Sequence, residues 1–413
     1  MNDCGEKMLS TDILKKTADE YGTPSFVFDA NELRYRVNRI KDILNRGDKK
    51  IRLCYSIKAN PFLIPLLTDI ADMLEVCSPG ELKICMSYKV RPEMIIYSGV
   101  HKETEDIKEA MAYGAGIITA ESIRHYELIR KVSQDMNKNV FIILRLSSKS
   151  QFGMSLNDIE YILRENKDNP LVTIEGIHYF AGTQRTKLKH QREELAMLKE
   201  VIEDLRNKYG LPLRWLEYGP GLAYPYFEGE DFSDTLKPVK ELADDLIESA
   251  SYSDLTIEMG RFIASSCGYY ISKVCDVKEA YDNIWCILDG GINHMNYLGQ
   301  MMGMKTPVII TLDNDKIQAL NNTSEQQLNN TDKTCKTQTL CGSLCTTNDI
   351  MVRNYTDADL SVGDVLVFCN IGAYSITEGL NLFLSRDMPV VLIHSDGIIT
   401  KVRDVTETWK LNS

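Results

Sequence analysis

A lysine at the end of an apolar run is the residue whose position most suggests chemistry. Lys58 directly follows the run Ile51–Ile57, which has the composition of a buried strand. A lysine there must either extend its amine to water or be used. Burial would favour the neutral amine, the form that reacts with a carbonyl group to give a Schiff base. The alternative is a surface lysine at the end of a strand.

Three further positions carry residues that could act on a ligand. Glu258, in TIEMGR, could be a salt-bridge partner or could hold a proton against a ligand nitrogen. The turn EYGPG, residues 217–221, could present backbone N–H groups to a phosphate, although Pro220 has none to offer. His178 and Phe180 stand two apart and so share a strand face, where His178 could equally be a buried core histidine. The remaining histidines do not cluster with cysteines or carboxylates, so no metal site is expected.

Eight short apolar runs, separated by amphipathic stretches at residues 105–115 and 191–210 among others, must position these residues. Eight strands alternating with helices predict a closed parallel (β/α)8 barrel, with an open doubly wound sheet as the alternative. In a barrel, chemistry sits at the carboxyl ends of the strands, where Lys58, Arg145 and Glu258 all fall. The predicted strands are Ile51–Ile57, Met73–Cys77, Met94–Tyr97, Gly116–Thr119, Val140–Leu146, Val172–Tyr179, Trp215–Tyr218 and Leu255–Glu258.

The pattern changes near residue 265, where strand-like runs joined by turns replace the alternation. This predicts an antiparallel all-β domain over residues 265–413, after a barrel at 26–264 and an N-terminal segment, 1–25, that packs on the β domain. Residues 313–337 are rich in Asn, Thr and Gln, which predicts a mobile polar loop.

Composition excludes several classes of protein. The 413 residues carry a formal net charge of -12, which argues against nucleic acid as a partner. No apolar run is long enough to cross a membrane, and the first residues lack the pattern of a signal peptide. The 11 cysteines show no paired metal-ligand spacing, so reduced thiols and a cytoplasmic location are expected.

Taken in order, these motifs resemble the fold-type III pyridoxal phosphate enzymes, and among them the ornithine, diaminopimelate and arginine decarboxylase family. That resemblance covers nearly the whole chain and implies a barrel followed by a β domain, as in alanine racemase. The segments that carry it are YSIKAN around Lys58, EVCSPGEL from Glu75, FGM from Phe152, GIHYFAGTQ from Gly176, YGPG from Tyr218, EMGR from Glu258, LDGGIN from Leu288, CGSLCTTND from Cys341 and GAY from Gly372.

The resemblance implies a role for each matching residue. Lys58 matches the lysine that holds pyridoxal 5'-phosphate as a Schiff base, and Glu258 the carboxylate that keeps the ring nitrogen protonated. Cys345 matches the cysteine that protonates the product carbanion, and in the family it comes from the other subunit, which implies a homodimer with shared active sites. Further expected cofactor contacts are Arg145, His178, Phe180, Thr183, Gly219, Gly221, Arg261 and Tyr374, and Thr346 and Asp349 are expected to bind substrate.

Departures from the family pattern bear on the substrate. Phe180 stands where many members place a histidine, Pro220 replaces a glycine, and Thr346 replaces an acidic residue that reads a distal ammonium. A threonine cannot neutralise that charge, so lysine, ornithine and diaminopimelate are not expected as substrates. The pattern looks more like a divergent branch in secondary metabolism that acts on glutamyl groups tethered to a carrier protein. The competing interpretations are a racemase of the same fold and a non-catalytic, decarboxylase-like binding protein.

Overall fold

The computed structural model describes residues 8–312 and 337–413, and these divide into two compact units. The barrel unit comprises Arg34–Tyr224 and Thr235–Ile263. The sheet unit comprises the described parts of 1–33, 225–234 and 264–413. The loop predicted at 313–337 falls almost wholly outside the described residues.

Eight parallel strands close into a barrel, which confirms the predicted fold over an open sheet. The first strand pairs with the last, with Cys54 opposite Glu258, and this pairing closes the ring. The strands are β2 (Arg52–Ser56), β3 (Met73–Val76), β4 (Ile95–Tyr97), β5 (Ile117–Ala120), β6 (Val140–Arg145), β7 (Val172–Phe180), β8 (Trp215–Gly219) and β9 (Asp254–Met259).

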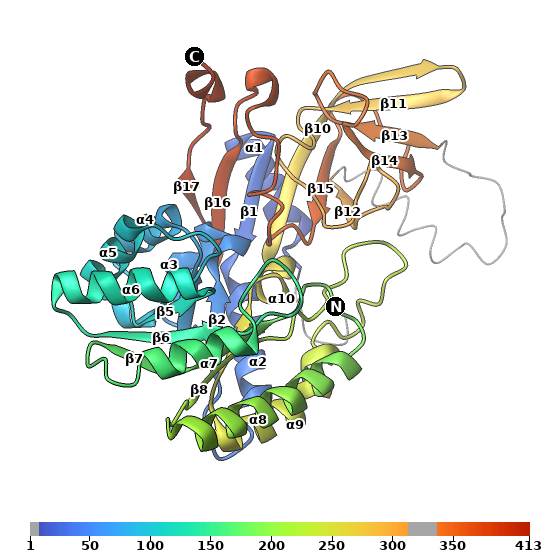
Figure 1. The fold of residues 1–413 in the computed structure, drawn as a ribbon. Helices are drawn as coiled ribbons and strands as arrows, with labels where there is room; N and C mark the ends of the chain where they lie inside the picture. The colour runs from blue at the N-terminus through green and yellow to red at the C-terminus, as the bar shows by residue number, and fades with distance from the viewer. Residues whose placement is uncertain (1–7, 313–336) are drawn as a thin grey trace. The chain divides into compact units, whose positions relative to one another are not determined.

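Helices follow the strands and surround the barrel (Figure 1). Ser78, Ser122 and Ser155 each cap a helix, because the serine side chain accepts a hydrogen bond from a backbone N–H of the first turn. The helices are α2 (Ala30–Leu44), α3 (Ile64–Leu67), α4 (Pro79–Ser87), α5 (Thr104–Tyr113), α6 (Ile123–Met136), α7 (Leu156–Glu165), α8 (Lys189–Tyr209), α9 (Lys237–Tyr252) and α10 (Arg261–Ala264).

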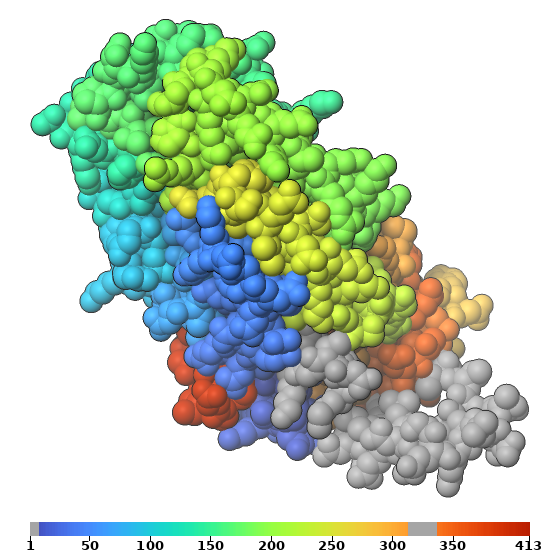
Figure 2. Space-filling model, turned by 90° about the horizontal axis from the view of Figure 1, so that it is seen from below, coloured from blue at the N-terminus to red at the C-terminus, as the bar shows by residue number. Residues whose placement is uncertain are grey.

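The segment that follows α2 contacts α9 near the place where the ring closes. Arg46, just after α2, lies 3.5 Å from Asp244 of α9, and Lys49 donates to the carbonyl oxygen of Ser251. Figure 2 shows the surface over α2 and α9 side by side on this face. The two ends of the barrel sequence are therefore joined by contacts between this segment and α9 as well as by the β2–β9 pairing.

The sheet of the second unit is mixed, which corrects the prediction of an antiparallel domain. Strand β1 runs parallel to β16, and β11 runs parallel to β13, whereas the other pairs are antiparallel. The strands are β1 (Ser25–Asp29), β10 (Gly268–Ala280), β11 (Asn283–Leu288), β12 (Ile309–Thr311), β13 (Gln338–Cys341), β14 (Ile350–Tyr355), β15 (Val365–Cys369), β16 (Val390–Ser395) and β17 (Ile398–Arg403).

The parallel pairing of β1 has a physical reason in the chain path. Because β1 lies near the N-terminus and β16 near the C-terminus, no tight hairpin joins them, and a long connection permits the parallel direction. Strand β1 lies between β10 and β16, so residues 26–29, which sequence reasoning assigned to the barrel, belong to this sheet.

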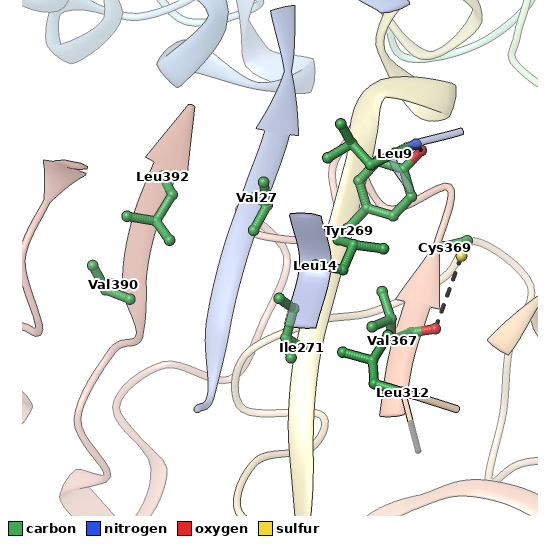
Figure 3. Packing of buried hydrophobic residues seen from close by; sticks show 10 residues of the cluster. All are labelled: Leu9, Leu14, Val27, Tyr269, Ile271, Leu312, Val367, Cys369, Val390 and Leu392. Carbon is green, nitrogen blue, oxygen red and sulfur yellow. Dashed lines mark hydrogen bonds between the residues drawn. The ribbon is translucent and has the colours of Figure 1, made fainter. Parts of the chain in front are cut away.

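Helix α1 (Thr11–Tyr21) covers one face of the sheet. Its residue Leu14 and the preceding Leu9 are buried among side chains of β1, β10, β15 and β16 (Figure 3). The Leu9 amide also donates to the Tyr269 hydroxyl at 3.1 Å. Among the described residues, no helix is both long and apolar enough to cross a membrane.

Candidate active site

Lys58 lies in the short helical turn Ile57–Ala59, which directly follows β2 at the carboxyl end of the barrel. Its Nζ lies 2.9 Å from Glu75 Oε2 and 3.6 Å from Glu258 Oε1. Both carboxylates come from the strands on either side of β2, namely β3 and β9, so the register of the barrel produces this arrangement. The lysine predicted to do chemistry therefore has two buried carboxylates within reach of its amine.

Glu258 is held as an anion by three neighbours. Ser56 Oγ donates to Oε1 at 2.9 Å, His178 Nε2 lies 3.3 Å from Oε2, and Lys58 adds its positive charge. Burial alone would raise the pKa of Glu258, but Lys58 and then His178 outweigh it and hold the pKa well below its usual range. Such an ionised, buried carboxylate is suited to pair with a protonated ring nitrogen.

A third carboxyl, that of Glu217 on β8, lies near the carboxyls of Glu75 and Glu258. It is completely buried, and neither carboxyl oxygen has a hydrogen-bond partner in the described chain. Burial raises the pKa of Glu217 well above its usual value, and the charges of Glu258 and Glu75 raise it further. His178, Glu217 and Glu258 each bring a ligand-type atom within 4.8 Å of the others, a grouping that sequence reasoning did not foresee.

On the opposite side of the barrel, Arg145 ends β6 and is buried. Its guanidinium donates to Glu121 Oε1 at 3.0 Å and lies 4.9 Å from the ring of Phe152. Nearby Lys102 is also buried, and burial lowers its pKa to about 8. Lys102 was missed from the sequence, because it stands in the polar stretch HKETE, which gives no sign of burial.

The turn after β8 and the loop after β7 form a narrow cradle. Gly221 has φ 59°, and a Cβ there would collide with the carbonyl oxygen of Gly182. A Cβ on Gly219 would likewise meet the ring of Phe180. The close backbone approach requires glycine at Gly221, as a turn that wraps a phosphate would.

Arg261 and Thr183 lie together in the barrel unit. The Nε of Arg261 donates to Thr183 Oγ1 at 3.4 Å. A guanidinium, a hydroxyl and backbone amides of a glycine turn are the donors that bind phosphate in proteins. With an amine that can form a Schiff base and an ionised carboxylate, these residues fit pyridoxal phosphate.

The remaining predicted residues belong to the sheet unit. Cys345 is exposed, Thr346 and Tyr374 are half-buried, and Tyr374 has φ 64°. Asp349 is buried, and its two oxygens accept hydrogen bonds from the amides of Ile292 and Leu344, at 2.9 Å and 2.8 Å. This pairing joins the loop of LDGGIN to the loop that carries Cys345, so the structure gives Asp349 a loop-positioning contact that sequence reasoning did not expect.

Comparison with known proteins agrees with this geometry. The family model described as "Pyridoxal-dependent decarboxylase, pyridoxal binding domain" matches residues 30–265. Diaminopimelate decarboxylase of Aquifex aeolicus is 24% identical over 95% of this chain and 92% of its own length. The L-glutamyl-(BtrI acyl-carrier protein) decarboxylase of Niallia circulans is 23% identical over 93% of this chain and 91% of its own length.

A solved structure shows the same fold. The crystal structure of diaminopimelate decarboxylase from M. jannaschii in complex with L-lysine superposes with a TM-score of 0.83, at 21% identity, over 98% of this chain and 95% of that one. The family match covers more than half of the chain and includes Lys58, Glu258 and the glycine turn. The chain therefore belongs to the pyridoxal-dependent decarboxylases, enzymes that remove carbon dioxide from amino acids with the help of pyridoxal phosphate.

Proposed function

We propose that this decarboxylase acts on an amino acid or amino-acyl group whose distal end carries no free ammonium, such as a glutamyl group tethered to a carrier protein. The placement of Lys58 between Glu75 and Glu258 carries the decarboxylase assignment. Thr346 carries the substrate assignment, because it stands directly after Cys345, at the position where an acidic residue would neutralise a distal ammonium. The carrier-protein relative in Niallia circulans supports a tethered substrate.

The family resemblance indicates the residues that would hold the cofactor. Lys58 would bind its aldehyde carbon and Glu258 would face its ring nitrogen, with Arg145, His178 and Phe180 around the ring. Thr183, Gly219, Gly221, Arg261 and Tyr374 would hold the phosphate. The bound cofactor supplies an electron sink for the carbanion that remains when carbon dioxide departs.

The protein's own groups would manage the protons. Glu75 Oε2, 2.9 Å from Lys58 Nζ, can accept a proton from the amine and return it. Glu258, ionised by its neighbours, can hold a proton on a nitrogen placed against it. We assign to Cys345 the donation of a proton to the substrate Cα after carbon dioxide has left. Cys345→Ala should therefore stop the formation of the decarboxylated amine as the single product, and unaffected turnover would contradict this role.

We also propose that the enzyme is a homodimer with shared active sites. An exposed apolar patch, formed by Leu380, Leu382, Phe383, Leu384, Trp409 and Leu411, lies beside the loop of Cys345. Asn412 Nδ2 donates to Leu382 O and joins the two segments of the patch, and Arg386 donates to Ser343 O and joins it to that loop. Apolar surface of this kind is typical of a protein–protein contact, and we assign it to a second copy.

Mixing two inactive variants tests the shared site. Lys58→Ala and Cys345→Ala dimers, unfolded and refolded together, should regain about one quarter of the native activity, because half of the dimers would contain one intact site. No recovery, with mixed dimers present by mass spectrometry, would show that each site uses one chain only.

Every cysteine that the structure describes is a free thiol, which supports a reducing compartment such as the cytoplasm.

The central experiment measures carbon dioxide release by the cofactor-loaded enzyme. One panel holds both enantiomers of lysine, ornithine, arginine and glutamate, with diaminopimelate, and the other holds a glutamyl thioester of pantetheine. Release from the thioester alone would support the proposal, and release from a free basic amino acid would refute it.

A specificity variant sharpens this test. Thr346→Asp introduces the missing carboxylate and should create activity on lysine or ornithine, whereas Thr347→Asp, one residue further along and exposed, serves as the matched control. An equal response in the two variants would show that position 346 does not read the distal group.

A further inference from the structure

Glu217 is a fully buried carboxyl that the proposed mechanism does not use. It lies on β8, the central one of three neighbouring strands, and it pairs with His178 on β7 and with Thr256 on β9. Neither of its oxygens has a hydrogen-bond partner among the described residues, and the Nδ1 of His178 is also buried without one. Buried polar atoms of native proteins are rarely left in this state, so the three atoms call for an explanation.

The charges around Glu217 cannot support a third anion. Its ionisable neighbours are Glu258 of β9, Glu75 of β3, His178 of β7, Lys58 after β2, Arg145 of β6 and Cys54 of β2. The Arg145 guanidinium is paired with Glu121, and Lys58 is shared by Glu75 and Glu258. Neither cation is therefore left to balance a charge on Glu217, and burial beside the anion Glu258 favours the protonated form of Glu217.

We infer that Glu217 carries a proton and acts as a neutral positioning residue, so that of the two neighbouring carboxyls Glu217 is the neutral one and Glu258 the ionised one. Glu258 is the ionised member, because Ser56, His178 and Lys58 all stabilise its charge. The proton on Glu217 leaves Glu258 free to face a ligand nitrogen as an anion. This inference rests on the proposed function only for that last role, since the protonation of Glu217 is a property of the protein without cofactor.

Infrared spectroscopy of the cofactor-free protein tests the proton directly. The wild-type spectrum should contain the C=O stretching band of a protonated carboxyl at neutral pH, and Glu217→Gln should remove it. Glu175→Gln is the matched control, because Glu175 lies on the neighbouring strand β7 but is half-buried, and the band should persist. Absence of the band from the wild type, or its survival in Glu217→Gln, would overturn the inference.

Stability as a function of pH gives a second readout. The pKa of Glu217 in the folded protein is raised above the value of 4.5 for the unfolded chain, so its contribution to stability is lost as the pH rises. Glutamine mimics the neutral acid and does not titrate. The difference between the melting temperature of Glu217→Gln and that of the wild type should therefore become more positive as the pH rises from about 5 to 8. A difference that stays constant with pH would contradict a protonated Glu217.

Two further measurements separate positioning from other roles. In the loaded enzyme, Glu217→Gln should keep the wild-type pH profile of the cofactor absorbance, and Glu217→Leu should shift it, because only glutamine keeps a neutral polar group beside Glu258. Zn²⁺ added to the cofactor-free protein should leave its melting temperature unchanged. Stabilisation by Zn²⁺ that disappears in Glu217→Gln would instead show a metal site at His178, Glu217 and Glu258. The infrared and stability results hold whether or not the enzyme accepts the proposed substrate.

Discussion

Replacing Lys58 with methionine should reverse the sign of the contribution that Glu258 makes to the pH dependence of stability in the cofactor-free protein. The native ammonium lies 2.9 Å from Glu75 Oε2 and 3.6 Å from Glu258 Oε1. Methionine keeps an unbranched side chain of similar length but removes the charge. The two buried carboxyls then lose the cation that they share.

The sign follows from the pKa of Glu258. In the native protein burial would raise this pKa, but Lys58 and His178 hold it below the usual value of 4.5, so the ionised group adds stability that is lost as the pH falls. Without Lys58 the effect of burial dominates and the folded pKa exceeds the unfolded one. The stability of Lys58→Met should therefore decline as the pH rises above about 4.5.

The magnitude depends on burial at the two ends of the ion pair. Removing one partner of a buried pair costs ~3–5 kcal/mol. The Lys58 side chain is 37% exposed, and the Glu75 side chain is 2% exposed. Because water screens the lysine end, we expect a loss near the lower limit, about 3 kcal/mol at pH 8. The melting temperature of the barrel should fall by roughly 6–12 °C.

Calorimetry of the cofactor-free protein between pH 4.5 and 9 would measure this effect. A second variant, Lys58→Met with Glu258→Gln, should recover a large part of the loss, because it removes one of the stranded charges. The control is Lys108→Met, which breaks an exposed pair with Glu105 and should leave the melting temperature almost unchanged. Equal pH slopes for Lys58→Met and the wild type would refute the reasoning.

Three further variants probe the cradle and the loop of Cys345. Gly221→Ala should lower the free energy of unfolding in urea by at least ~2 kcal/mol more than Gly210→Ala and should also weaken cofactor binding. Both glycines have positive φ, but only at Gly221 would a Cβ collide with backbone, so equal losses of stability would contradict the close approach. Gly219→Ala should weaken cofactor binding by displacing the ring of Phe180, and Phe180→Leu added to it should restore part of the affinity in a spectroscopic titration; no restoration would exclude the ring as the obstacle. Asp349→Asn should increase amide hydrogen exchange in both loops that it joins, and unchanged exchange would show that the contact does not order them.

The barrel could be predicted because its strands are short apolar runs at regular spacing. Lys58 and Glu258 could be found for a related reason, since a charged residue at the carboxyl end of a barrel strand is conspicuous. Ser56 and Glu217 could not be assigned a role from the same sequence. Both lie within strands, and only the register of the closed barrel shows that Ser56 contacts Glu258 and that Glu217 lies opposite His178.

The burial of side chains in loops was the second feature that could not be predicted from the sequence. Lys102 and Asp349 stand in polar stretches that suggest solvent exposure, yet both are buried and hydrogen-bonded to backbone groups. The mixed sheet was missed for a different reason. The fully buried strand β1 carries no signal for its partners, which come from the far end of the chain.

The position of β1 has a consequence for the way this protein is made. Residues 25–29 leave the ribosome early, whereas β10 and β16, the strands on either side of them, are synthesised hundreds of residues later. Until then the apolar segment SFVFD has both edges unpaired, a state that favours association with other chains. The sheet can be completed only after residue 395 has been synthesised, and a truncated product that lacks β16 would leave one edge of β1 open. We therefore expect the chain order to increase the need for chaperones during synthesis, although each unit is compact once complete.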